Sequence, residues 1–340
     1  MHHRLIAGAF CALLIAVSAR AAGLAPAMPP PHDPNAYPDF GYHVDEGWAK
    51  PGRKWGGVSA VDMDRDGKSV WVFDRCGSPD GGCATSKLAP VMEFDATGRL
   101  VRNWGAGRFR YPHGIFVDRD DDIWTADGLA KDGAAGEVVR KWTPGGKLLM
   151  TLGRFGVGDS DTAHFNGLSD VLVAPDGDIF VADGHEHDSK ANNRIVKFDA
   201  HGKYLMQWGR TGTGPGEFNS PHGLAMDREG RLYVADRANN RIQIFDQNGH
   251  FLGQWRQFGR PSGIFITKDD MIYVADSLSS PKNNPGFRNG IRWGRIADGK
   301  VIGFIPWNEY NTIEGVAVDD AGNIYAGFTN TMNFRRFVKG

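Results

Sequence analysis

The chain has 340 residues, 46 of them glycine, with an apolar fraction of 41% and a formal net charge of −1. A charge this close to zero argues against a nucleic-acid footprint and against binding to an anionic membrane. The apolar fraction is ordinary for a globular protein. All-β barrels and propellers often exceed about 200 residues as one domain, so the length is compatible with a single large unit.

Residues 1–21 have the features of a secretory signal. Arg4 precedes an apolar run from Leu5 to Val17, and Ala19-Arg20-Ala21 offers a cleavage site. The apolar run is too short to span a bilayer. We therefore expect a periplasmic or secreted protein with no membrane attachment after cleavage. The Pro- and Ala-rich residues 22–40 predict an extended linker.

The mature chain would keep two cysteines, Cys76 and Cys83. An exported protein meets an oxidising environment, where two cysteines this close in sequence can pair. We expect a local disulfide that closes the Gly- and Pro-rich loop from Gly77 to Gly82.

Residues 41–340 contain a repeated unit, which is clearest between Phe218 and Asp246. One apolar run ends at the turn Arg228-Glu229-Gly230, a second ends at Asp236, and a third strand follows the turn Asn239-Asn240-Arg241. Short strands of β-branched, aliphatic and aromatic residues between Gly, Asp and Asn turns predict an antiparallel meander. Because one meander is not stable alone, the unit needs copies of itself.

Six copies follow one another at spacings of 40 to 56 residues, in the range of propeller blades. Each pairs an inner apolar strand with a second strand after a polar turn. The units begin near Val58-Ser59-Ala60, Pro112-His113-Gly114, Leu168-Ser169-Asp170, Pro221-His222-Gly223, Pro261-Ser262-Gly263 and Ile313-Glu314-Gly315. The second strands end at Asp74, Asp127, Asp183, Asp236, Asp276 and Phe328.

The sequence therefore predicts an all-β, six-bladed β-propeller. Third strands are expected at Val91–Phe94, Val138–Trp142, Ile195–Phe198 and Ile242–Phe245, and fourth strands at Leu100–Trp104, Tyr204–Trp208 and Phe251–Trp255. A linear solenoid would need distinct capping repeats, which the sequence lacks.

The two ends of the propeller are expected to meet. In the last blade, Phe334–Val338 supplies a third strand. The segment Tyr42–Trp48 can supply the missing outer strand, which would close the ring and leave few unpaired edges.

The second residue of each opening triplet should lie at one mouth of the central channel. In blade order this position alternates between small hydroxyl residues and metal-ligand types. Alternate blades of a six-fold ring lie ~120° apart by symmetry, so the ligand types on blades two, four and six converge on the axis. The position reads Ser59, His113, Ser169, His222, Ser262 and Glu314.

Two imidazoles and a carboxylate suit Zn²⁺, with a fourth position left for water or substrate. The same groups also suit Fe²⁺ or Mn²⁺. The pattern predicts a metal held by His113, His222 and Glu314. The alternative is that these side chains are solvated residues of the channel mouth.

Three further residues are expected at this mouth, because each second strand runs back toward it. Arg75 follows Asp74, His185 follows Asp183-Gly184, and Arg237 follows Asp236. Arg75 can hold a carboxylate in a bidentate pair, and His185 can act as a general acid or base. Glu186 and His187 are weaker candidates. The repeated strand-end aspartates are interpreted as turn and strand-end caps.

These residues resemble the NHL-repeat propellers, and among them the peptidyl-α-hydroxyglycine α-amidating lyase family. The resemblance rests most on four stretches: Phe73-Asp74-Arg75, Tyr111-Pro112-His113-Gly114, Asp183-Gly184 through Asn193-Arg194-Ile195, and Phe218 through Phe245. It implies a propeller that binds zinc through channel histidines. It also implies cleavage of a C-terminal α-hydroxyglycine into an amide and glyoxylate.

By resemblance, His113 and His222 match two zinc ligands and Arg75 matches an active-site arginine. The family's third histidine position holds Glu314, and its catalytic tyrosine falls where His185 stands. An aspartate that the family links to a structural calcium is replaced by Gly315, so that calcium is not expected here.

The resulting hypothesis is an exported, monomeric, metal-dependent C–N lyase that acts on a small-molecule or peptide substrate and binds no nucleic acid. Two alternatives stay open. One is a non-catalytic NHL propeller that binds a peptide or protein. The other is a lactonase-type hydrolase, although lactonase propellers commonly ring a Ca²⁺ with carboxylates and Asn side chains, and the channel position here is rich in histidine.

Overall fold

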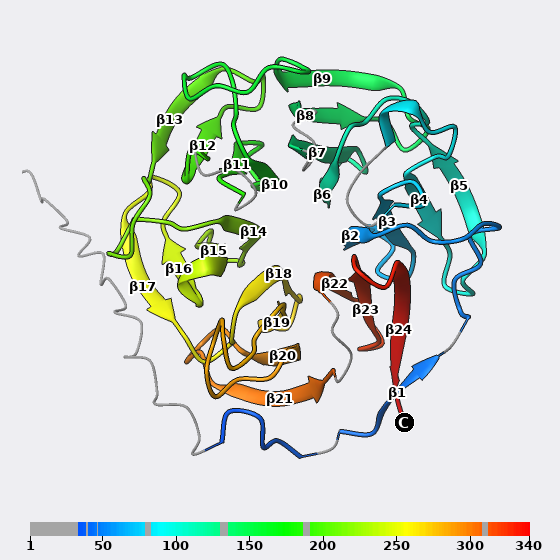
Figure 1. Cartoon of the computed structure of the whole chain (residues 1–340), viewed down its shortest axis with the longest axis vertical. Helices are drawn as coiled ribbons and strands as arrows, with labels where there is room; N and C mark the ends of the chain where they lie inside the picture. Colours follow the sequence, from blue (N-terminus) through cyan, green and yellow to red (C-terminus); the bar gives the residue numbers. More distant parts are fainter. Residues whose placement is uncertain are drawn as a thin grey trace, which may run out of the picture.

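The computed structural model describes residues 33–38, 40–45, 47–78, 83–129, 135–185, 191–307 and 312–340. The expected signal segment, most of the expected linker, and Glu186 and His187 lie outside these residues. Within them the chain forms six four-stranded antiparallel sheets arranged around a central axis (Figure 1). The predicted six-bladed propeller is confirmed.

The innermost strand of each blade faces the axis, and the six begin at the predicted opening triplets. Blades are numbered here from one to six in chain order. The inner strands are β2 (Val58–Met63), β6 (Pro112–Val117), β10 (Leu168–Val173), β14 (Pro221–Met226), β18 (Pro261–Ile266) and β22 (Ile313–Val318).

The second strands run antiparallel to the inner strands and are almost fully buried, because neighbouring blades cover both of their faces. These strands are β3 (Val70–Asp74), β7 (Ile123–Leu129), β11 (Ile179–Asp183), β15 (Leu232–Asp236), β19 (Met271–Asp276) and β23 (Ile324–Phe328).

The third and fourth strands complete each blade toward the outside of the ring. The third strands are β4 (Val91–Phe94), β8 (Ala135–Trp142), β12 (Arg194–Phe198), β16 (Arg241–Phe245), β20 (Gly290–Arg295) and β24 (Asn333–Lys339). The fourth strands of blades one to five are β5 (Leu100–Trp104), β9 (Leu148–Gly153), β13 (Tyr204–Trp208), β17 (Phe251–Trp255) and β21 (Val301–Pro306). Two short 3₁₀ helices, η1 (Cys83–Thr85) and η2 (Arg237–Asn239), follow second strands.

The ring closes through the N-terminal strand, as predicted. Strand β1 (Tyr42–Asp45) pairs antiparallel with β24 and is the outer strand of blade six, with Tyr42 opposite Lys339. The strand is shorter than the expected Tyr42–Trp48. Trp48 packs instead between blades one and six, with its ring centroid 5.1 Å from that of Tyr325.

The described part of the expected linker contacts blade five. Asn35 donates to the carbonyl oxygen of Gly286 at 3.0 Å and accepts from the backbone of Arg288 at 2.8 Å. Phe40 packs edge-on against Trp293, with ring centroids 5.1 Å apart. The described linker residues therefore pack against the propeller.

The hydrophobic core consists of clusters that each join two neighbouring blades. For example, Tyr233 and Ile242 of blade four pack with Ile264 and Ile272 of blade five. Removing apolar surface from water at every such junction is the main driving force for ring assembly. The same junctions fix how the inner strands face the axis.

In blades one to five, the strand-end aspartates tie the second strand to the loop before its own inner strand, as the cap interpretation predicted. Asp236 accepts from the backbone N–H of Asn219 at 2.8 Å, and Asp276 accepts from that of Arg260 at 2.9 Å. Burial raises the pKa of both carboxyls. In blade five, Arg292 pairs with Asp276 at 3.0 Å, and both side chains are fully buried.

Candidate functional site

A bulge turns the second residue of each inner strand toward the channel. The pairing register with the second strand shifts at this point in every blade, for example between Pro112 and Gly114 and between Pro221 and Leu224. Such a bulge takes one residue out of the ladder and re-aims its side chain. The six channel residues predicted from the sequence all line one central cavity: Ser59, His113, Ser169, His222, Ser262 and Glu314.

Glycine after these residues lets the inner strands approach one another closely. A Cβ at Gly223 would lie 2.3 Å from the backbone oxygen of Ser262, and one at Gly263 would lie 2.6 Å from that of Glu314. A side chain at either position would push two blades apart. The glycine collar, defined as Gly114, Gly223, Gly263 and Gly315, therefore holds the channel residues near the axis.

The residues after three second strands are pinned over the same mouth by backbone hydrogen bonds. The N–H of Arg75 bonds the carbonyl oxygen of Gly57 at 2.8 Å, and that of Arg237 bonds Ser220 at 3.1 Å. The N–H of His185 bonds Gly167 at 2.6 Å in the same way. The structure therefore places all three side chains where the sequence predicted them.

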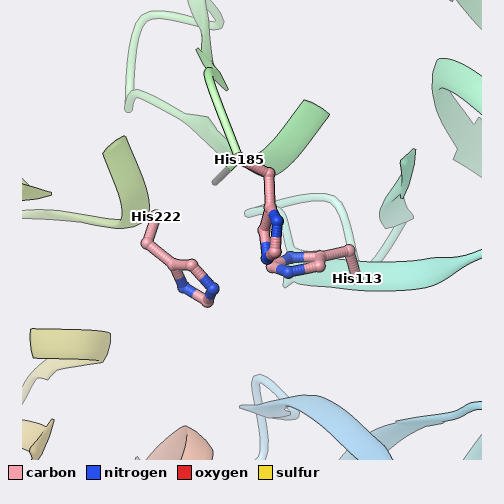
Figure 2. Close-up of side chains that lie close together, drawn as sticks. All are labelled: His113, His185 and His222. Atoms are coloured by element: carbon pink, nitrogen blue, oxygen red, sulfur yellow. The ribbon is translucent and has the colours of Figure 1, made fainter. Parts of the chain in front are cut away.

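Three histidines from three consecutive blades come together at this mouth. Figure 2 shows His113 on β6, His222 on β14 and His185 on the loop after β11, with their rings close together. Their ring centroids lie 4.6 to 5.2 Å apart, and one ring nitrogen from each lies within 4.8 Å of the others. All three side chains are nearly fully buried. Three imidazoles this close together could hold a metal ion.

The tautomer of His113 is set by its neighbour. Its Nδ1 lies 2.7 Å from the carbonyl oxygen of Ser169. A carbonyl oxygen only accepts, so Nδ1 carries the proton and Nε2 keeps its lone pair. A backbone carbonyl behind one ring nitrogen is the usual support of a histidine that binds a metal through the other nitrogen.

His222 is kept neutral. Burial lowers the pKa of its imidazole well below the usual value, and the Arg237 cation, His113 and the Arg75 cation lower it further. A neutral imidazole offers a lone pair to a metal or to a proton. In the structure, Nε2 of His222 accepts a hydrogen bond from Nη1 of Arg237 at 2.8 Å.

Arg237 lies at the centre of the cluster. Its Nη1 also lies 3.2 Å from Ser262 Oγ and 3.3 Å from Glu314 Oε2, and its Nη2 lies 3.4 Å from His185 Nε2. The side chain is 2% exposed. The sequence placed Arg237 at the mouth but gave it no role. The signal was its position after Asp236, which matches that of Arg75 after Asp74.

Glu314 faces the cluster from blade six. Its Oε2 lies 3.3 Å from Nε2 of His222 and accepts from Ser262 Oγ at 3.1 Å. It is outside the group of three ring nitrogens that lie mutually within 4.8 Å. The ligand set predicted from the channel position, His113, His222 and Glu314, stays a prediction, while the geometry also offers a set in which His185 is the third member.

Arg75 extends the positive charge along the mouth. The side chain is 3% exposed, and its Nε donates to the carbonyl oxygen of Pro112 at 3.3 Å. The guanidinium lies 4.2 Å from the ring centroid of Tyr111, a cation–π contact. Two arginines beside the neutral imidazole of His222 form a site suited to an anion such as a carboxylate.

The disulfide predicted between Cys76 and Cys83 is present. Cys76 comes directly after Arg75, and the bridge ties it to Cys83, the first residue of η1. Cys76 also donates its backbone N–H to Asp74 at 2.7 Å. The bridge therefore constrains the backbone from which the Arg75 side chain reaches the site.

A cavity of about 410 Å³ runs along the inner strands below the channel residues. Its walls are mostly apolar, but they include the carboxyl groups of Asp62 and Asp170. Burial raises the pKa of Asp62 to about 7 and that of Asp170 to about 8, and the Asp62 charge adds to the second effect. Each carboxylate accepts a backbone N–H from the next blade, that of Val117 or Leu224.

Among the described residues, no helix has the length and apolar character needed to cross a membrane.

Blade four matches a known repeat family. Residues 218–245 match the NHL repeat. The chain carries an NHL repeat in this blade. The match covers the unit from which the propeller was predicted, so the resemblance to NHL-repeat propellers is confirmed.

Relatives over part of the chain carry amidating-enzyme names. Peptidyl-glycine alpha-amidating monooxygenase B of Xenopus laevis is 33% identical over 218 residues, which cover 58% of this chain and 24% of that protein. A probable peptidyl-alpha-hydroxyglycine alpha-amidating lyase of Caenorhabditis elegans is 32% identical over 208 residues, covering 56% of each. The chain thus spans about a quarter of the first relative and about half of the second.

A solved structure shares the fold. A gluconolactonase from Xanthomonas campestris superposes with a TM-score of 0.58 at 15% identity, over 84% of this chain and 86% of that one. At this identity the likeness shows the propeller fold alone.

Proposed function

We propose that this protein is a metal-dependent lyase that cleaves the C–N bond of an α-hydroxyglycine-type substrate and releases glyoxylate. The observation that carries the proposal is the convergence of His113, His185 and His222 beside the two buried cations Arg75 and Arg237. The name of the Caenorhabditis elegans relative, an amidating lyase, supports the same reaction class.

The donor set fits a zinc ion. In a tetrahedral site with Zn–N of about 2.0–2.1 Å, ligand nitrogens lie ~3.4 Å apart. The three ring nitrogens here lie within 4.8 Å of one another, so small side-chain rotations bring them to that spacing. His113, His185 and His222 would hold the ion. Fe²⁺ or Mn²⁺ is the alternative that the same side chains allow.

This arrangement exchanges the roles that the sequence predicted for His185 and Glu314. His185, predicted as an acid or base, joins the ligands, and Glu314, predicted as a ligand, is left as a carboxylate that can receive a proton. A bound zinc supplies Lewis acidity that lowers the pKa of a hydroxyl group in contact with it.

Residues of the chain bind the substrate carboxylate and accept its hydroxyl proton. Arg75 and Arg237 hold the substrate carboxylate through charge-assisted hydrogen bonds. Glu314 takes the hydroxyl proton. The oxygen's electron pair forms the carbonyl of glyoxylate as the C–N bond breaks, and the nitrogen leaves with that bond's electron pair and receives a proton to become the amide.

The setting in which this reaction takes place is part of the proposal. The signal-like residues 1–21 and the Cys76–Cys83 disulfide support export to the periplasm or the outside of the cell. We expect a monomer that binds a small-molecule or peptide substrate, and no structural calcium beside Gly315.

The experiment uses the mature protein loaded with Zn²⁺ and N-benzoyl-α-hydroxyglycine as the probe. We expect glyoxylate release that stops on chelation and returns with added Zn²⁺. Arg75→Met should raise KM, because the carboxylate loses a partner. No release from protein that holds its full metal content would contradict the lyase proposal. A lactone panel with Zn²⁺ and with Ca²⁺ then tests the hydrolase alternative.

A non-catalytic role predicts a different result. If the propeller only binds a peptide or protein, His222→Ala leaves both metal content and stability unchanged. Loss of metal from His222→Ala would contradict this prediction of the non-catalytic hypothesis.

A further inference from the structure

Both Arg237 and a bound metal would use the same nitrogen atom, Nε2 of His222. Nε2 of His222 has a single in-plane lone pair, and Nη1 of Arg237 donates to it at 2.8 Å. A metal bound to the same nitrogen needs that lone pair at about 2.0–2.1 Å. The guanidinium N–H and the metal cannot both use it.

We propose that Arg237 competes with the metal for Nε2 of His222, and that a carboxylate bound by Arg237 relieves this competition. Metal and carboxylate would then bind cooperatively. The inference rests on the proposed function, because it takes the three histidines as the metal set.

The contacts of Arg237 define the first of two states. In this state Nη1 is held by His222, by Ser262 Oγ at 3.2 Å and by Glu314 Oε2 at 3.3 Å, while Nη2 reaches His185 Nε2 at 3.4 Å. The guanidinium therefore contacts two of the three expected ligands at once. Metal binding has to displace it from both.

An incoming carboxylate supplies the second state. A guanidinium pairs with a carboxylate through two parallel N–H donors, which is stronger and more directional than a bond to a neutral imidazole nitrogen. Arg75 lies at the same mouth, with its Nε 3.3 Å from the carbonyl oxygen of Pro112, the residue before His113, so a carboxylate there meets two cations. Turning Arg237 to the carboxylate frees Nε2 of His222 for the metal.

Linkage makes the effect reciprocal. A ligand that shifts Arg237 away from His222 raises metal affinity, and the metal raises affinity for that ligand by the same factor. Couplings between sites are commonly about 5- to 150-fold. We expect about tenfold here, because one charge-assisted hydrogen bond is exchanged.

The test measures Zn²⁺ affinity by competition with a chelator on the mature chain. The anion probe is N-benzoylglycine, which carries the carboxylate but no α-hydroxyl. Saturating N-benzoylglycine should tighten Zn²⁺ binding to the wild type about tenfold. Arg237→Met should bind Zn²⁺ about tenfold more tightly without the anion and gain less than twofold from it. The control is Arg228→Met, which removes an exposed arginine paired with Asp270 and should behave as wild type.

Two outcomes contradict the inference. Equal Zn²⁺ affinity of wild type and Arg237→Met shows that the guanidinium does not compete. An undiminished gain from N-benzoylglycine in Arg237→Met shows that the anion acts without Arg237, for instance as a ligand of the metal itself. By contrast, Zn²⁺ binding to neither protein contradicts the proposed metal site.

A second measurement uses the wild type alone, in case Arg237→Met fails to fold. Nitrogen NMR of metal-free protein follows Nε2 of His222 while N-benzoylglycine is added. The resonance should move toward that of an imidazole nitrogen with an unshared lone pair. A resonance that stays unchanged at saturation overturns the two-state exchange.

Discussion

Replacing Gly223 with alanine tests whether close approach of the inner strands builds the site. The new Cβ would lie 2.3 Å from the backbone oxygen of Ser262, whereas ordinary contact begins at 3.4 Å. The two atoms must separate by about 1 Å, and both belong to inner strands whose backbone cannot rotate away. Overpacking of this kind costs about 1–3 kcal/mol, so we expect a lower midpoint of urea unfolding.

The matched control is Gly145→Ala. A Cβ there meets only Thr143 Oγ1, at 3.9 Å, and the backbone conformation is one that alanine accepts. That variant should unfold at or slightly above the wild-type midpoint, because alanine restricts the unfolded chain. Zn²⁺ affinity provides a second readout, since the shift at Gly223 moves His222 with it. A Gly223→Ala protein with wild-type unfolding and wild-type Zn²⁺ affinity would refute the role assigned to the glycine collar.

Three further predictions concern stability. Asp276→Ala strands the fully buried Arg292 cation and should cost about 3–5 kcal/mol in the free energy of unfolding, whereas a loss below 1 kcal/mol in urea denaturation would argue against the ion pair. Burial raises the pKa of Asp170 to about 8, so the folded state keeps a proton that the unfolded state loses above pH 4. Stability should fall as pH rises from about 4 to about 8, and Asp170→Asn should flatten that slope; an equal slope in both proteins would contradict the assignment. Reducing the Cys76–Cys83 bridge should lower the free energy of unfolding by about 2–3 kcal/mol, and an unchanged midpoint in reductant would show that it contributes nothing.

The arrangement of the ring could be predicted from the sequence because each blade repeats the same local signals. An apolar inner strand begins at each opening triplet, and the second strand of blades one to five ends near an aspartate that caps the loop before the inner strand, as Asp236 does with Asn219. These signals are short in range: the inner strand recurs in all six blades, and the aspartate recurs in blades one to five. The offset between triplet and strand end therefore placed His113, His222 and Arg75 at one mouth without any knowledge of packing.

Some outer strands were missed because their markers are absent. Strands β20 and β21 of blade five contain Gly290, Gly294 and Gly303, and they end without the tryptophan that marks the outer strand in blades one, three and four. A long loop also separates β19 from β20. Strand β9 likewise ends in Gly153 instead of tryptophan. Packing against the neighbouring blade, not local propensity, forms these strands.

The spacing of the repeats in the sequence could not settle which three side chains form the proposed metal-binding group. Ring symmetry places Glu314 on an alternate blade with His113 and His222, but symmetry does not say how far each side chain reaches. In the structure His185 lies within reach of the other two histidines, while Glu314 contacts Arg237 and His222.

The metal content of three proteins tests the account most directly. Wild type, His185→Ala and Glu314→Gln are purified as mature chains and analysed for bound zinc. The account predicts one equivalent in wild type and in Glu314→Gln, and little in His185→Ala. Zinc retained in His185→Ala and lost in Glu314→Gln would contradict it and favour the set of His113, His222 and Glu314.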